Sequence, residues 1–407
     1  MLSQYRGLPK QVYIICFARI VTSMGAFIFS MNSLLMTTVL GLSEVATGYI
    51  MLVLSAFDIA GTLVGGRLAD RYGRKKTILM ALSVETAALI LGGFLVRNLA
   101  VIACEAVVMF CFAMFFPIVG AMITDKTADG KREESFSLLF LCINVGYSLG
   151  QVIAGAIFYN YTEWIFWGQG IATVLTIMLL TLFVKDDYVP LTGRGKGEVK
   201  AENLTNRNLA GMILKDMPLL LFLTAMVLTG YAYSQVSYMM PLQFSAFFGA
   251  EAASKWVAKL WIVNGVFCII WSPVILKITK GHNEFLIIMC AAVLYMLGMG
   301  SFTFISTTTT AGLIYLLTPI WTAGEVIIAV HNGILLGSRA PESYRARYQS
   351  LYEFTNSAGR MIGPVTMGYF LIGHTYNQGW VMVAAICLAA AIIIYTAYIK
   401  DRVNERG

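Results

Sequence analysis

Twelve apolar runs, each long enough to cross a lipid bilayer, constrain this chain more than any other feature of its sequence. An α-helix needs about 20 apolar residues to span the ~30 Å hydrocarbon core. Hydrophobic residues make up 58% of the 407 positions and charged residues only 13%, whereas a typical soluble domain has about 25% charged residues. The sequence therefore predicts an all-α membrane protein. Its expected spans are about 12–36, 45–66, 77–96, 99–123, 136–159, 164–184, 218–245, 256–276, 284–305, 311–337, 347–371 and 379–399.

The basic residues are distributed unevenly between the two sides of these spans. Of the 29 Lys and Arg residues, 24 fall in the two termini and in alternate connections, including the clusters at 67–76 and 126–132. By the positive-inside rule we expect these connections and both termini to be cytoplasmic, in a multi-pass protein of the cell membrane. The net charge of +7 is spread over short segments, so we expect no nucleic-acid partner.

One long polar stretch, residues 185–217, divides the chain into two halves. We interpret it as a cytoplasmic linker, either a passive tether or a helix lying on the membrane surface. It predicts an N-terminal six-helix bundle at 1–184 and a C-terminal one at 218–407. An internal repeat supports this division. When the sequence is compared with itself at a shift of 213 residues, glycines of span five align with glycines of span eleven. These interhelix glycines are Gly146, Gly150 and Gly155, aligned with Gly359, Gly363 and Gly368.

Several ionisable residues lie within the spans, where a charge costs about 2.5–3.5 kcal/mol at the bilayer centre and calls for a partner or a water-filled cavity. Asp58 and Glu325 are central in their spans, and Glu353 lies in span eleven. Desolvation disfavours the ionised form of such carboxylates, so they are candidates for proton coupling. The alternative is a permanent structural ion pair. For Glu85 and Glu105 we expect a structural role.

Other polar residues within the spans are candidates for a substrate cavity, since such groups in transporters line a water-filled path. Packing is the alternative for each of them. Glu353, Asn356 and Arg360 are spaced so that they share one helix face. The cavity candidates are Arg19, Asn32, Asn144, Tyr233, Gln235, Tyr238, Asn264, Asn356 and Arg360.

The segment GRLADRYGRKK at residues 66–76 resembles the signature loop of the major facilitator superfamily, in the connection where that family carries it. The resemblance implies two six-helix bundles and a cytoplasmic charge lock, with Gly66 allowing close helix approach. It assigns the lock to Gly66, Asp70, Arg71, Gly73, Arg74, Asp125 and Arg132. The equivalent connection of the second half, 277–283, has lost the motif.

Two further segments resemble the twelve-helix drug/proton antiporters of that superfamily. GYSLGQVIAG, residues 146–155, is similar to their span-five motif, although Gln151 stands in place of the proline and Ala154 in place of a glycine. Gly324 and Glu325 are similar to a Gly-Glu pair found in some multidrug exporters. The resemblance implies a role for Glu325 in handling protons or cations.

These features together predict a secondary active transporter that works by alternating access, most simply as a proton-coupled exporter of small amphipathic compounds. The alternative is a carrier of an anionic metabolite, sugar, peptide or lipid by symport, uniport or flipping, because Arg19 and Arg360 can bind an anion. The chain has three histidines and no HExxH motif, so we expect no enzyme, no metal site and no cofactor, with the proton gradient as driving force. The expected partners are the lipid bilayer, a small-molecule substrate and protons, and we expect a monomer.

Overall fold

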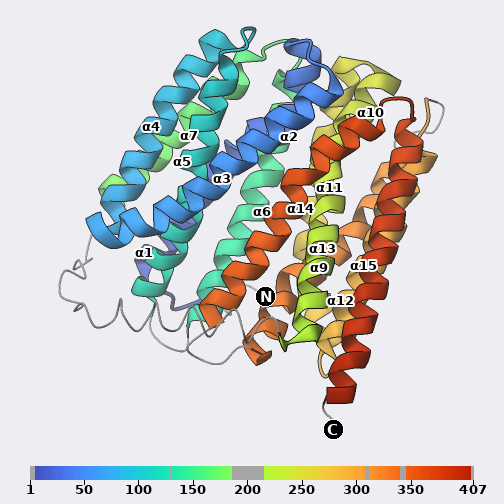
Figure 1. Ribbon diagram of the computed structural model, residues 1–407. Coiled ribbons are helices and arrows are strands. Elements are labelled where there is room, and N and C mark those ends of the chain that lie inside the picture. The colour runs from blue at the N-terminus through green and yellow to red at the C-terminus, as the bar shows by residue number, and fades with distance from the viewer. Residues whose placement is uncertain (1–4, 128–130, 186–214, 308–311, 340–344, 405–407) are drawn as a thin grey trace. The chain divides into compact units, whose positions relative to one another are not determined.

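The computed structural model describes residues 5–127, 131–185, 215–307, 312–339 and 345–404 (Figure 1). Within these residues the regular structure is entirely helical. The chain divides into two compact units: unit 1 comprises Met1–Thr192 and Met240–Val266, and unit 2 comprises Gly193–Met239 and Phe267–Gly407. The predicted bundle boundaries at 184 and 217 stay a prediction, since most of the linker lies outside the described residues.

The helices of unit 1 pack around α1, α4 and α5. In this unit α1 packs against α6 and α7, while α4 packs between α5 and α7, and α3 packs against α5. A buried apolar cluster lies between α1, α4 and α5, with Ile78, Phe115 and Ile118 almost fully enclosed. The helices are α1 (Lys10–Met24), α2 (Phe27–Leu34), the π-helical η2 (Leu35–Val39), α3 (Glu44–Tyr72), α4 (Arg74–Leu95), α5 (Val101–Lys126), α6 (Arg132–Ile157) and α7 (Glu163–Phe183).

Unit 2 repeats the pairings of unit 1 along the chain. Here α9 packs against α14 and α15, just as α1 packs against α6 and α7 in unit 1. Similarly, α12 packs against α13 and α15, just as α4 packs against α5 and α7. The division between the units falls inside α11. The remaining helices are α9 (Met217–Ser237), α10 (Met239–Phe248), α11 (Ala250–Thr279), α12 (Glu284–Gly300), the 3₁₀ turn η3 (Ser301–Phe304), α13 (Gly312–Arg339), α14 (Arg345–Phe370) and α15 (Tyr376–Asn404).

Eleven segments in the described residues are long and apolar enough to cross a membrane. The predicted span 347–371 falls in α14, which is outside this set because it carries several polar residues, among them Glu353, Asn356 and Arg360. The predicted spans one and seven are each interrupted. The first breaks at Gly25 between α1 and α2, and the seventh breaks at Tyr238 between α9 and α10.

Local chemistry explains where several helices begin and end. Ser43 accepts a hydrogen bond from the Ala46 amide at the start of α3, and Asp216 accepts one from Leu219 at the start of α9. Such N-caps satisfy amides that the first helical turn leaves without partners. Gly73, with φ of +93°, makes the turn between α3 and α4, a conformation that L side chains disfavour.

Candidate functional site

Glu325 is the centre of a polar group in unit 2 that joins two helices. It lies on α13, and its Oε1 accepts a hydrogen bond of 2.9 Å from the hydroxyl of Tyr233 on α9. The Cys268 thiol of α11 lies 4.0 Å from its Oε2. Aromatic rings surround the tyrosine: those of Trp321 and Tyr295 have their centroids 6.1 Å and 6.5 Å from that of Tyr233. Glu325 itself is half-buried.

Arg360 of α14 reaches the same tyrosine from the other side. Its guanidinium carbon lies 4.6 Å from the centre of the Tyr233 ring, a cation–π distance, and the arginine is exposed. Tyr233 therefore contacts an acid through its hydroxyl and a base through its ring face. The structure brings together three of the residues that the sequence predicts for the site, from spans seven, ten and eleven. We call Glu325, Tyr233 and Arg360 the Glu325 site.

The other members of the predicted polar face of α14 are placed differently. Asn356 is buried, and its side chain donates to the backbone carbonyl of Met226 on α9 at 3.4 Å. Glu353 is exposed and accepts a hydrogen bond of 3.1 Å from Gln349 on its own helix. These hydrogen bonds therefore do not involve Tyr233.

Unit 1 contains a second polar group, enclosed in its core. Arg19 of α1 is 2% exposed and lies over three phenylalanine rings of α5, at 4.3 to 5.6 Å from their centres. It interacts electrostatically with Glu85 of α4, which is fully buried and accepts a hydrogen bond of 3.4 Å from Gln169 of α7. Glu105 of α5 is also fully buried, and neither of its oxygens has a hydrogen-bond partner among the described residues.

The sequence pattern alone did not connect Glu85 with Gln169. Each is a single polar residue in an apolar span, and the two are 84 positions apart. One signal could have found them: Arg19, Glu85 and Gln169 are each polar residues within apolar spans of the first half, and such groups tend to meet in a helix bundle.

The remaining cavity and proton candidates fall into two groups by exposure. Asp58 and Asn144 are half-buried on α3 and α6, and the Asn144 amide donates to the Phe140 carbonyl of its own helix at 2.9 Å. The buried residues are Asn32 on α2, Gln235 on α9, Tyr238 at its C-terminal end and Asn264 on α11.

The predicted lock is formed in part in unit 1. Arg74, the first residue of α4, pairs with Asp125 near the end of α5 and donates to the Ala121 carbonyl at 2.7 Å. Arg71 lies over the ring of Tyr72. The side chains of Asp70 and Arg132 lie outside the described part of the structure.

Gly66 differs from what the resemblance implies. No atom lies within 4 Å of the position that a Cβ would take there. The close approach of α3 to α5 occurs at the preceding residue, Gly65, and about one turn before it, at Gly61, where an added Cβ would collide with Met114 and Phe110, respectively.

The interhelix glycines mark equivalent contacts in the two units. In unit 1 a Cβ on Gly146 or Gly150 would collide with the Ile20 or Met24 carbonyl of α1. In unit 2 a Cβ on Gly359 would collide with the Val227 carbonyl of α9, and Val227 follows Ile20 by 207 residues. Gly363 lies against α9 in the same way, and Gly155 lies against Ser254 and Ala258 of α11.

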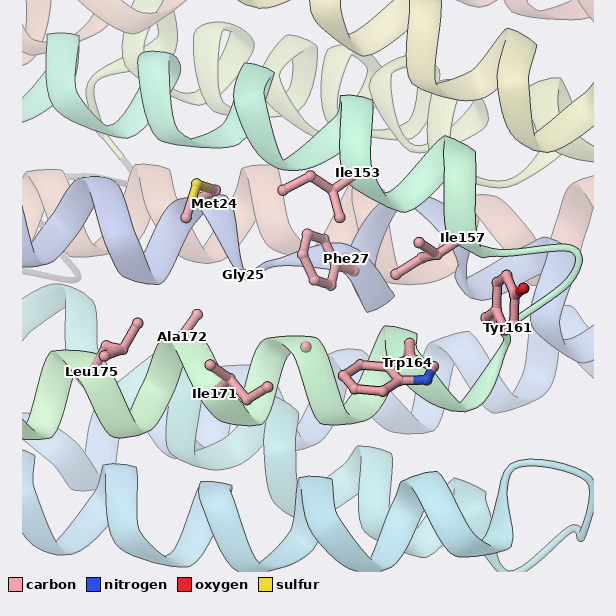
Figure 2. Close-up of a pocket in the computed structure, with 11 residues that line it drawn as sticks. Met24, Gly25, Phe27, Ile153, Ile157, Tyr161, Trp164, Ile171, Ala172 and Leu175 are labelled. Carbon is pink, nitrogen blue, oxygen red and sulfur yellow. The ribbon is translucent and has the colours of Figure 1, made fainter.

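An apolar pocket of about 430 Å³ lies between the α1–α2 break, α6 and α7 in unit 1. Figure 2 shows Ile153 and Ile171 on opposite walls with Phe27 between them, and Tyr161 and Trp164 at one end. No charged residue lines it.

Two similarly built units of membrane-length helices, with ionisable side chains enclosed among them, define the class of the protein as a polytopic membrane transporter. The chain belongs to the Major Facilitator Superfamily, whose family model matches residues 15–364.

Relatives and solved structures agree with this membership. The chain is 23% identical over 360 residues to a Na(+), Li(+), K(+)/H(+) antiporter of Planococcus maritimus, covering 81% of this chain and 83% of that protein. It is 23% identical over 394 residues to the uncharacterized MFS-type transporter YttB of Bacillus subtilis, covering 97% and 96% of the two chains.

Among solved structures, a POT family transporter in complex with a thioalcohol conjugated peptide matches with a TM-score of 0.79 at 14% identity, over 98% of this chain and 99% of that one. The nucleoside transporter NupG matches with a TM-score of 0.76 at 11% identity, over 96% and 99%. These structures share its fold. The relatives are transporters and not enzymes.

Proposed function

We propose that the protein exports small amphipathic cations in exchange for protons, with Glu325 as the carboxylate that binds the proton. The observation that carries this proposal is the contact of Tyr233 with both Glu325 and Arg360. An ionised Glu325 attracts an organic cation, and the aromatic rings beside it favour such a ligand through cation–π contacts. Protonation removes that charge, so proton and substrate oppose each other at one site.

The opposed binding supplies the coupling between the two fluxes. When a proton enters the site, the cation loses its ionic partner and dissociates, and when the proton leaves, the site is ready for the next cation. Two bundles that expose this site alternately to each side of the membrane would then exchange a cation for a proton. The similarity to the Na(+), Li(+), K(+)/H(+) antiporter of Planococcus maritimus supports this mode.

Arg360 favours a second candidate, the transport of an anionic solute. The arginine is exposed, and a guanidinium can bind a carboxylate or phosphate through two parallel hydrogen bonds. In that case Arg360 would leave the Tyr233 ring to hold the anion, and Glu325 would serve to position Tyr233.

Proton movement in inside-out vesicles with a preset pH gradient tests these proposals. We expect a lipophilic cation such as tetraphenylphosphonium to release protons in the wild type and not in Glu325→Gln, which mimics the protonated carboxyl. Glu251→Gln, at an exposed residue of α11 that pairs with Lys255, is the matched control and should keep the response. Proton release that is unchanged in Glu325→Gln would reject the role of this carboxylate, and a response to anions alone would favour the second candidate.

A further inference from the structure

A histidine joins three helices at the end of unit 2 where α11 turns into α12. His331 of α13 places its Nδ1 2.6 Å from Oε2 of Glu284, the first residue of α12. Its Nε2 lies 2.9 Å from the hydroxyl oxygen of Thr279, the last residue of α11. The His331 side chain is 4% exposed and that of Glu284 is 24% exposed. We call these three residues the histidine latch.

The hydrogen atoms available to the latch determine its protonation. Thr279 has one hydroxyl hydrogen, and its oxygen lies 2.7 Å from the Ile275 carbonyl, which can only accept. If the hydroxyl donates to that carbonyl, Nε2 must itself carry a hydrogen and donate to Thr279. An ionised Glu284 can also only accept, so Nδ1 must carry a hydrogen as well. All three contacts are satisfied together when the imidazole is doubly protonated.

We infer that the histidine latch is a proton-binding site, separate from the Glu325 site, and that its proton holds α11, α12 and α13 together. With the proton present, His331 and Glu284 form a charge-assisted pair. When the proton leaves, either Nδ1 becomes an acceptor facing the carboxylate of Glu284, or Thr279 turns its hydroxyl hydrogen from the Ile275 carbonyl to Nε2; in both cases one contact and the charge of the pair are lost. His331 therefore acts as a positioning residue for this end of the unit and not as a contact to the substrate.

The repeated architecture gives the latch its significance. In unit 1 the equivalent helices are α3, α4 and α5, and there Arg74 at the start of α4 pairs with Asp125 of α5. In unit 2 the acid, Glu284, is at the start of α12 and the base, His331, is on α13. The positions of acid and base are therefore the reverse of those in unit 1. The base in unit 2 is an imidazole, which carries a charge only when both ring nitrogens are protonated, whereas an arginine stays charged. The connection that lost the signature motif thus carries a proton-dependent contact in its place.

Among the side chains that the structure describes, the other charged groups at this end of unit 2 pair with one another or are exposed. Arg339 of α13 donates to Asp216 at the start of α9 and to Asp401 of α15, at 2.5 to 3.2 Å. α9 carries no charged residue beyond this cap, and α14 contributes the buried phenols Tyr348 and Tyr352. Three further groups are exposed on α11 and the connection after it: Lys277, Lys280 and His282.

Nitrogen NMR of labelled histidine tests the proton count directly. The chain has three histidines, so a protein with His282→Gln and His374→Gln reports on His331 alone. In the full-length protein in lipid nanodiscs at neutral pH we expect both ring nitrogens to be protonated, and this signature to be lost in Glu284→Gln. A ring with one protonated nitrogen at neutral pH would overturn the inference, because it would mean that Thr279 donates to Nε2 and not to Ile275.

Transport assays provide a second, independent readout. In the wild type we expect the transport rate to change with pH on the side facing the latch. His331→Arg keeps a fixed charge, so this variant should fold and should lose the pH dependence of transport. Thr279→Val should weaken the latch and shift the pH dependence of transport to lower pH. A pH dependence unchanged in His331→Arg would reject the latch as a control of transport. The NMR result does not depend on the role proposed for Glu325, so the two proposals can fail separately.

Discussion

At the scale of single residues, Tyr233 carries the chemistry of the Glu325 site because it offers two different surfaces. Its hydroxyl donates to a carboxylate and its ring face lies under a guanidinium. A phenol that donates to an anion has a more electron-rich ring, which strengthens the attraction for a cation above it. In the proposed mechanism, proton binding at Glu325 would change the attraction between the Tyr233 ring and Arg360.

Tyr233→Phe should move the pH dependence of transport to higher pH. The hydroxyl stabilises the ionised form of Glu325 more than the neutral carboxyl, so its loss lets the carboxyl bind a proton at lower proton concentration. A hydrogen bond to a charged group contributes about 1.5–3 kcal/mol, which corresponds to a displacement of about one to two pH units. The measurement is substrate-driven proton release against pH. Tyr315→Phe, at an exposed tyrosine of α13, should leave the profile in place, and an unmoved profile in Tyr233→Phe would contradict the coupling.

At the scale of helices, glycines determine which pairs approach most closely. The contact of Gly146 and Gly150 with α1 in unit 1 is repeated by Gly359 and Gly363 with α9 in unit 2. In a bilayer, helix association depends on such backbone contact because lipid tails are as apolar as the side chains. These equivalent contacts lie at the glycines that the internal repeat aligns.

Gly359→Ala should destabilise the α9–α14 contact. The added Cβ would collide with the backbone of Val227 and Tyr231, and overpacking of this kind costs about 1–3 kcal/mol. The midpoint of thermal unfolding in detergent should fall. Gly333→Ala on α13 is the control, because nothing lies within 4 Å of its added Cβ and helix propensity favours Ala by about 1 kcal/mol. Equal midpoints for the two variants would mean that this glycine does not limit the approach of the helices.

At the scale of the whole molecule, the twelve predicted spans and the uneven distribution of basic residues predict the orientation. An even number of spans brings both termini to one side, and 24 of the 29 basic residues lie on that side or in the termini themselves. The connections predicted to lie on the opposite side contain only Arg97 and Lys255. A charge bias this large normally determines topology during insertion.

Reporter fusions in a bacterial host test the orientation. Green fluorescent protein joined after Gly407 should fluoresce, because it folds in the cytoplasm, and alkaline phosphatase joined after Gly249 should be active, because it requires the opposite side. The reverse result for both fusions would invert the predicted topology. It would also place the Arg74–Asp125 pair and the histidine latch on the outer side of the membrane.

The length of the spans, the two halves and the family signature follow from the sequence, because each depends on neighbouring residues and on the fixed thickness of a bilayer. Composition alone identified the helical membrane class, and the signature at 66–76 identified the family. Glu325, Tyr233 and Arg360 were each recognisable as polar residues in apolar spans. The polar character of α14 was also visible as its Glu353, Asn356 and Arg360.

Only the tertiary structure decided which side chains meet. Glu325 and Tyr233 are 92 positions apart, and whether they touch depends on how their helices are rotated about their own axes, which periodicity in a uniformly apolar span does not reveal. The same reason explains why Arg19, a predicted cavity residue, lies over phenylalanine rings. It also explains why the sequence does not predict the histidine latch. A partner chosen by packing is a property of several helices at once, and no single segment of the sequence contains it.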